Sequence, residues 1–202
     1  LQLRLIFKLS KARTLNQVAN SLWGKLGMGL RYAYDRSGPL AMAPSQLGAF
    51  VKSDPAQPSA NLQYHVQPLS LERFGEPLHT FPAFTASVCN LRPKSRGRVD
   101  IRSANPDDAP LIDPNYLSHP DDLSVAADAI RLTRHIVASP ALQGFSPEEY
   151  LPGPELHTEQ QLYEADARIG TTIFHPVGTC RMGQDSDAVV DAQLRVHGVV
   201  GL

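Results

Sequence analysis

The side chain in this chain with the clearest capacity for chemistry is His175, within Thr171-Thr-Ile-Phe-His-Pro-Val-Gly-Thr-Cys-Arg-Met-Gly183. The imidazole follows the apolar pair Ile173-Phe174 and precedes Pro176 and Gly178, a pattern typical of a loop that holds a side chain rigidly toward a ligand. Because imidazole titrates at a pH of about 6.5, it can exchange a proton near neutrality. We therefore predict that His175 acts as an acid or base.

Other roles for this histidine remain open at the level of the residues alone. It could be a loop or core histidine whose ring nitrogens bond to backbone groups. His175, Cys180 and His197 could bind a metal, but their spacings of five and seventeen residues match no familiar zinc pattern, so we predict no metal site. A Cys180 nucleophile paired with His175 would need an orienting third residue, which the sequence does not indicate.

Composition narrows the class of partner. The chain has 202 residues, with 19 basic and 20 acidic side chains and a net charge of -1. This balance gives no basic surface for nucleic acid, and we expect no nucleic-acid partner. No apolar run approaches the roughly 20 residues of a membrane helix, so we expect no transmembrane segment. The first residue is not Met, and we expect a piece of a longer protein with any targeting signal upstream. With only two cysteines, Cys89 and Cys180, we expect a reducing, cytoplasmic compartment.

The elements that must position the histidine are predicted from periodicity and capping. Alternation of apolar and polar residues predicts strands at 1–9 and 62–66, the first with one buried face, and further strands are expected at 84–91 and 98–102. Helices are expected after three capping pairs: Thr14 with Gln17, Ser118 with Asp121, and Thr158 with Gln161. Strands and single helices without a regular βαβ alternation indicate an α+β fold with a mostly antiparallel sheet and helices packed on one side.

Two long connections and one tryptophan complete the predicted fold. The segments 37–60 and 103–117 are predicted to be long irregular connections, because Pro and polar residues interrupt them. Met42, Pro44 and Gln46 in the first could face a ligand. Trp23 lies in a predicted helix that also holds Gly24, Gly27 and Gly29, and we expect its ring in the core.

Several phrases together resemble the glucose-methanol-choline (GMC) oxidoreductases, most closely the bacterial choline dehydrogenase and alcohol dehydrogenase-like branch. The resemblance covers nearly the whole chain, and its motifs are specific. The phrases are Ser37-Gly-Pro-Leu-Ala-Met-Ala-Pro-Ser-Gln-Leu-Gly48, Asn90-Leu-Arg-Pro-Lys-Ser-Arg-Gly97, Pro110-Leu-Ile-Asp-Pro-Asn-Tyr-Leu117, Phe174-His-Pro-Val-Gly-Thr-Cys-Arg-Met-Gly183, Ala188-Val-Val-Asp191 and Leu194-Arg-Val-His-Gly-Val199.

The resemblance implies an enzyme that oxidises a small alcohol, choline-type or another primary alcohol, to an aldehyde by hydride transfer to FAD. It implies that His175 is the catalytic base, that Phe174 walls the substrate pocket, and that Pro176 and Val177 lie close to the flavin ring. It also implies a substrate-binding domain at 1–170 and, at 171–202, an active-site loop that begins the return into an FAD-binding domain.

The sequence departs from the family pattern in ways that matter. It has no strand-turn-helix GxGxxG for the ADP part of FAD, and it stops before the family's second catalytic His or Asn. We therefore expect a fold truncated at both ends, an incomplete flavin site, and FAD bound through a missing N-terminal domain. The alternatives are a domain of the same fold that does not catalyse, or a metal or cysteine hydrolase that uses His175 and Cys180.

Overall fold

The computed structural model describes residues 1–43 and 45–202. The chain forms two compact units, one made of Leu1–Lys94 and His119–Thr171, the other of Ser95–Ser118 and Thr172–Leu202. These units are defined by packing alone. The functional division into a substrate-binding part at 1–170 and a flavin-proximal part at 171–202 stays a prediction.

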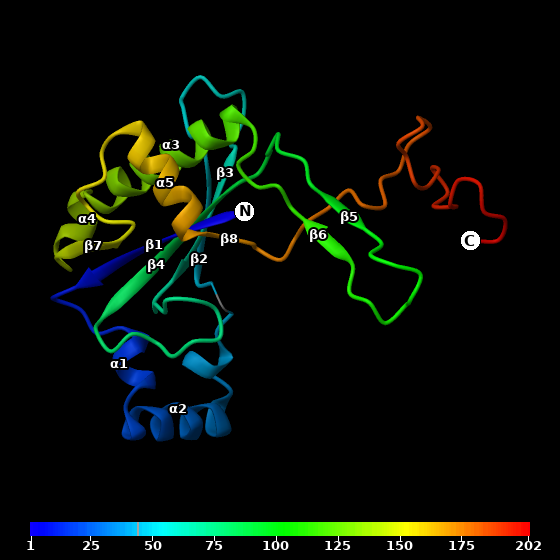
Figure 1. Cartoon of the computed structure of the whole chain (residues 1–202). Helices are drawn as coiled ribbons and strands as arrows, with labels where there is room; N and C mark the ends of the chain where they lie inside the picture. The colour runs from blue at the N-terminus through cyan, green and yellow to red at the C-terminus, as the bar shows by residue number, and fades with distance from the viewer. Residues whose placement is uncertain (44) are drawn as a thin grey trace. The chain divides into compact units, whose positions relative to one another are not determined.

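An antiparallel sheet is the centre of the first unit (Figure 1). Its strands run in the order β2-β3-β4-β1-β7, and β8 pairs with β1 beside β7. Each of these pairings is antiparallel. The strands are β1 (Gln2–Leu9), β2 (Leu47–Val51), β3 (Leu62–Gln67), β4 (Ala83–Asn90), β7 (Pro147–Leu151) and β8 (Gly170–Thr171). The predicted α+β class with a mostly antiparallel sheet is confirmed.

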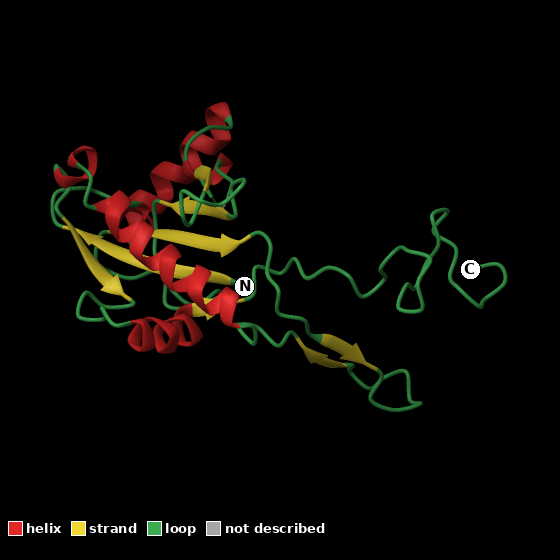
Figure 2. Ribbon diagram, turned by 90° about the horizontal axis from the view of Figure 1, so that it is seen from above, coloured by secondary structure: helices red, strands yellow, loops and turns green. Residues whose placement is uncertain are grey.

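Two long helices cover the sheet (Figure 2). The helical elements are α1 (Leu15–Ala19), α2 (Leu22–Asp35), the 3-10 turn η1 (Pro39–Ala41), α3 (Pro120–Val137), α4 (Pro140–Gln143) and α5 (Glu159–Ile169). Helices α3 and α5 pack against each other and against β1. Ile130 of α3 and Leu162 of α5 are fully buried, and the Tyr64 hydroxyl on β3 lies 2.8 Å from Thr133 Oγ1 on α3. In the described part of the chain, no helix has both the length and the apolar character needed to cross a bilayer.

Strand β1 is buried on both faces, so the prediction of one buried face was wrong. Gln2 and Arg4, at the polar positions of the alternation, are each only 5% exposed. Arg4 donates hydrogen bonds to the carbonyls of Leu71 and Glu72, and its guanidinium lies 4.6 Å from the centre of the Phe74 ring. The connection between β3 and β4 therefore covers the second face, a contact between distant segments that strand periodicity cannot report.

Helix starts follow the predicted caps in two of three places. Gln161 Oε1 accepts from Thr158 N, and Gln161 N donates to Thr158 Oγ1, as the capping box requires. The amide of Thr14 donates to Gln17 Oε1 at 3.0 Å. The prediction for Ser118 was wrong: the chain enters α3 one residue later, where His119 Nδ1 accepts from Asp121 N and Pro120 takes the first helical position.

The predicted irregular connections contain short strands, which corrects that expectation. β2 lies within 37–60 and pairs with β3, and β6 (Leu111–Asp113) lies within 103–117. In the second unit, β6 pairs with β5 (Arg98–Asp100) in a two-stranded sheet. Gly97 permits this pairing, because a Cβ there would stand 2.1 Å from the Asp113 carbonyl oxygen. Strands of five and three residues leave little periodic signal in the sequence.

Candidate active site

The turn before His175 is held by one hydroxyl group. Thr172 Oγ1 accepts a hydrogen bond from Phe174 N and another from the Tyr116 hydroxyl, each at 3.1 Å. Phe174 adopts a φ of 61°, in the left-handed region that non-glycine residues rarely enter. Such a backbone persists where its surroundings enforce it, and it is typical of sites that position a side chain. Sequence reasoning missed both anchors; a Thr two residues before the turn was a local signal for one, and nothing local marks Tyr116.

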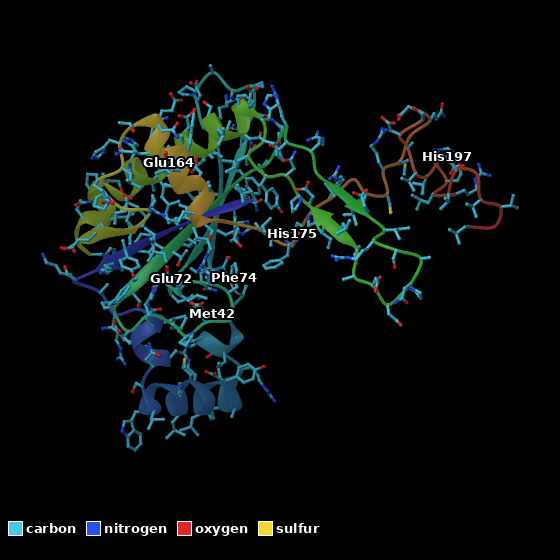
Figure 3. All side chains as sticks on the ribbon, in the orientation of Figure 1. Met42, Glu72, Phe74, Glu164, His175 and His197 are labelled. Carbon is cyan, nitrogen blue, oxygen red and sulfur yellow. The ribbon has the colours of Figure 1, made fainter. Side chains whose placement is uncertain are left out.

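His175 projects from this turn as an exposed side chain (Figure 3). Within residues 1–43 and 45–202, its ring nitrogens bond to no protein group. His175 is therefore not a histidine whose ring nitrogens are hydrogen-bonded to backbone groups of the described chain. An imidazole in this state can accept a proton at one nitrogen and donate at the other to a ligand.

The residues around His175 form an exposed apolar row. Phe174 is 66% exposed and Val177 is 93% exposed, while Pro176 is also exposed, and Gly178 has a φ of 106°. Apolar side chains this open to solvent on both sides of a polar ring are unusual for a surface loop, and they favour contact with an apolar ligand or protein surface. The four residues that the sequence singled out, 174–177, are consecutive in the chain and are all exposed.

The segment that follows, from Arg181 to Gly198, closes on itself. The Arg181 guanidinium binds both carboxylate oxygens of Asp185 and, with the Asp187 amide, lowers the pKa of Asp185 to about 2. His197 Nε2 donates to the Gly183 carbonyl at 3.0 Å, and Arg195 Nε donates to Asp191 Oδ2 at 2.7 Å. This bonding gives the segment after His175 its own scaffold of exposed ion pairs and backbone bonds.

The described residues around His175 and Cys180 are not arranged as a metal site or as a cysteine nucleophile with its base. Among the residues that the structure describes, no three His, Cys, Asp or Glu side chains are arranged to hold a metal ion. One ring nitrogen of His197 is engaged by the Gly183 carbonyl. Cys180 is exposed, and in the described chain its thiol is not hydrogen-bonded to His175. A nucleophile and base of the kind a cysteine hydrolase needs are therefore not assembled.

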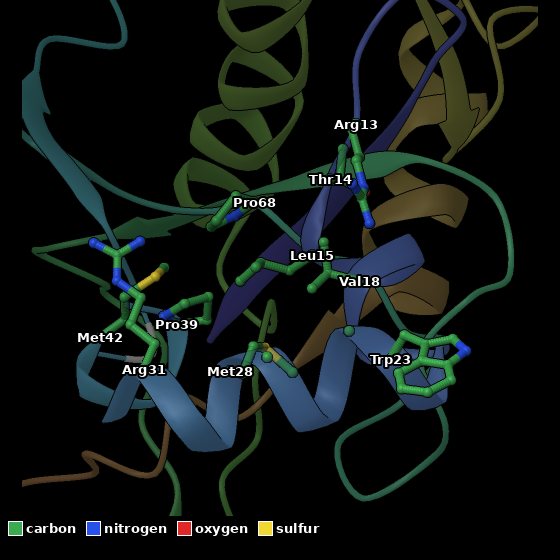
Figure 4. A pocket seen from close by; sticks show the side chains of 12 residues that line it. Arg13, Thr14, Leu15, Val18, Trp23, Met28, Arg31, Pro39, Met42 and Pro68 are labelled. Atoms are coloured by element: carbon green, nitrogen blue, oxygen red, sulfur yellow. The ribbon is translucent and has the colours of Figure 1, made fainter. Parts of the chain in front are cut away.

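A separate groove lies in the first unit, between α1, α2 and η1 (Figure 4). It encloses about 540 Å³, has an apolar lining that includes Met28, Met42 and Pro68, and carries Arg13 and Arg31. Met42, which the sequence suggested could face a ligand, lines this groove. Gln46 bonds through Nε2 to the Ala43 carbonyl, and Pro44 lies outside the described residues.

Comparisons with known proteins agree with the sequence motifs. A family model described as GMC oxidoreductase matches residues 93–202. The alcohol dehydrogenase [acceptor] of Pseudomonas putida is 40% identical over 168 residues, which are 83% of this chain and 30% of that protein. The oxygen-dependent choline dehydrogenase of Escherichia coli O45:K1 is 38% identical over 180 residues, which are 89% of this chain and 32% of that protein. The chain thus spans about a third of the length of these relatives.

Solved structures share the fold. Pyridoxine 4-oxidase from Mesorbium loti superposes with a TM-score of 0.69 at 26% identity, over 96% of this chain and 35% of that one. An FAD-dependent oxidoreductase from Chaetomium thermophilum gives a TM-score of 0.79 at 19% identity, over 98% of this chain and 40% of that one, which shows likeness of fold alone. Together with the family match over more than half of its residues, these findings establish that the chain belongs to the GMC oxidoreductase family.

Proposed function

We propose that this chain is the substrate-binding and catalytic part of an FAD-dependent enzyme that oxidises a choline-type or other primary alcohol to an aldehyde. The observation that carries the proposal is His175, exposed and without a protein partner for its ring in the described chain, between the exposed side chains of Phe174 and Val177. The names of two relatives, an alcohol dehydrogenase and a choline dehydrogenase, describe oxidation of substrates of this kind.

His175 has the chemistry that the reaction needs. A neutral alcohol is a poor hydride donor, and removal of its hydroxyl proton makes the carbinol carbon a better one. In our proposal a ring nitrogen of His175 takes that proton, or donates a hydrogen bond to the developing alkoxide. The positive φ of Phe174 and the Thr172 hydroxyl constrain the backbone that carries His175, which would help to position the base before the alcohol arrives.

The described residues of this chain could contact the flavin ring of FAD, but they include no site for its diphosphate. The apolar surfaces of Phe174, Pro176 and Val177 are exposed and could cover a flat ring and the adjacent alcohol carbon. When bound, FAD would supply the two-electron acceptor for the alcohol. Gly24, Gly27 and Gly29 lie inside α2 and not in a strand-to-helix turn, so they cannot serve as the Gly-rich turn for the diphosphate. We therefore assign nucleotide binding to an N-terminal domain of the whole protein.

The proposal is tested on the full-length protein under anaerobic conditions. Addition of a primary alcohol or choline should bleach the flavin absorbance and release an aldehyde in equal amount, because the alcohol loses one proton and one hydride. Flavin that no alcohol reduces would instead support the alternative of a domain that keeps the fold without catalysis. Hydrolysis that is sensitive to chelators or thiol alkylation, in a protein without flavin, would support the hydrolase alternative.

A further inference from the structure

Helix α2 displays a row of large apolar side chains to solvent. Trp23, which we expected in the core, is 82% exposed, and no residue of α2 is buried. The row, here called the α2 stripe, has these exposures: Leu22 83%, Trp23 82%, Leu26 51%, Leu30 62% and Tyr34 92%. Single exposed apolar residues are ordinary, but five on one helix mark a surface that is covered in the working protein.

Most of the stripe lies on the side of α2 that faces away from the groove, while Trp23, at the edge of the stripe, also lines the groove (Figure 4). Gly24 marks the opposite side, because a Cβ there would stand 2.0 Å from the Val18 carbonyl oxygen, so the helix approaches α1 at that point. Met28, four residues on, faces the groove between α1, α2 and η1 (Figure 4). At about 100° per residue the stripe covers an arc of roughly 120°, and Gly24 and Met28 fall outside it.

Cations border the stripe on both sides. On the same helical projection Lys25 falls beyond one edge of the arc and Arg31 beyond the other, and both are exposed. Arg36, which ends the helix, adds a third positive charge, and Asp35 is the one acid in 22–36. Three cations and one carboxylate give this segment a charge of +2, whereas the whole chain carries -1. The local charge therefore favours an anionic surface.

We propose that α2 lies in the headgroup region of an anionic lipid bilayer, with its stripe turned into the acyl chains. Trp23 and Tyr34 near the two ends are the residues that membrane interfaces favour, and Leu26 and Leu30 between them supply apolar area. Lys25 is exposed beside the stripe and is placed to reach lipid phosphates. Arg31, at the other edge, also lines the groove and donates from Nε to Ser37 Oγ at 2.8 Å, but it is exposed and adds its positive charge to this surface. At 14 residues, α2 is too short to span a bilayer and suited to lie along one. This inference is independent of the proposed alcohol oxidation.

Vesicle flotation of the full-length protein tests the proposal. Binding should be stronger to vesicles of phosphatidylcholine with phosphatidylglycerol than to phosphatidylcholine alone, and salt should weaken it. Leu26→Glu with Leu30→Glu should lower the partition coefficient by at least ~10-fold, because the substitutions remove apolar area from the stripe and add charges that anionic headgroups repel. A matched double variant, Ile101→Glu with Ile112→Glu, changes two exposed apolar residues in the second unit and should bind as the unchanged protein does.

A second double variant tests the same proposal in case the Leu26→Glu and Leu30→Glu substitutions impair folding. Lys25→Gln with Arg31→Gln leaves the stripe intact and should reduce binding to the anionic vesicles by roughly 10-fold or more, at about 1 kcal/mol for each cation near the surface. Equal binding to both vesicle types, or none, would overturn the proposal. So would a dimer that Leu26→Glu with Leu30→Glu converts to monomer, since the stripe would then pair two copies. Loss of bound flavin in that variant alone would assign the stripe to another part of the same polypeptide.

Discussion

Two titratable side chains of this protein lie in opposite surroundings. His175 is exposed, with no protein group on its ring in the part of the chain that the structure describes. Asp166 of α5 is fully buried, and neither of its carboxylate oxygens has a partner among the described residues. The first arrangement suits exchange of protons with a ligand. The second imposes a cost on folding that depends on pH.

The cost at Asp166 has a definite sign. Burial raises the pKa of this carboxyl to about 8, against the opposing influence of Arg131. The folded state therefore keeps a proton that the unfolded chain releases above about pH 4. The contribution of Asp166 to stability is fully present below that pH and is lost as the pH rises toward 8. The slope from this one group approaches about 1.4 kcal/mol per pH unit within that window.

Asp166→Asn should remove this dependence, because the amide resembles the protonated acid in shape and cannot ionise. We expect the variant to gain stability over the unchanged protein steadily from pH 5 to pH 8, measured by urea unfolding at several pH values. Glu164→Gln, on the exposed side of the same helix (Figure 3), is the matched control and should leave the pH profile unchanged. Parallel profiles for Asp166→Asn and the unchanged protein would contradict the argument.

The sequence could predict part of this residue-scale description. Pro176 and Gly178 indicate a loop, and the structure has a loop there with His175 exposed. The burial of Asp166 follows from Leu162, Ala165 and Ile169, which share its side of α5, yet an acidic residue normally argues against burial. The anchor on Thr172 from Tyr116 joins segments 56 residues apart, and no local pattern reports it.

At the scale of elements, Arg134 of α3 joins the helix layer to the connection between β7 and α5. Its Nε and Nη2 atoms donate to the two oxygens of Glu149, each at 2.8 Å. Nη1 donates to the Leu156 carbonyl and Nη2 also donates to the Gly153 carbonyl. The Glu149 side chain is 7% exposed, so the pair is well shielded from water. This contact ties α3 to β7 and to the connection that precedes α5.

Arg134→Lys should therefore destabilise the fold although it keeps the charge, because lysine cannot form the two-pronged contact or reach both carbonyls. We expect a loss of about 2–4 kcal/mol in the free energy of unfolding, measured with urea. Arg131→Lys on the same helix, which breaks a more exposed pair with Asp128, should cost less than about 1 kcal/mol. Equal losses of unfolding free energy for the two substitutions would show that the Arg134 contact contributes no more to stability than the exposed Arg131 pair.

The elements that the sequence predicted best carry a clear local signal, such as apolar residues in a regular pattern or a capping residue. β1, β3, β4, α3 and α5 appear within a few residues of their expected positions. The misses have two physical causes: β2 and β6 are short, and the second buried face of β1 depends on the distant connection between β3 and β4. Trp23 was misplaced because a large aromatic residue on a helix is usually in a core.

At the scale of the whole molecule, the chain accounts for about a third of the length of its relatives. The family and the sheet with its helices are established for this chain, and the alcohol oxidation is what we propose for the whole protein. Family membership gives the fold and the general class of reaction, but function resides in particular side chains. The proposed alcohol oxidation therefore depends on what His175 does when substrate and flavin are both bound.

The most direct measurement is the rate of anaerobic flavin reduction by alcohol in full-length His175→Ala. We predict that the variant retains its flavin and that the rate falls by at least ~100-fold, the usual scale for loss of a positioned base. His135→Ala, which removes an exposed histidine on α3, should leave the rate unchanged. Reduction of the flavin in His175→Ala at the rate of the unchanged protein would contradict the role assigned to this histidine.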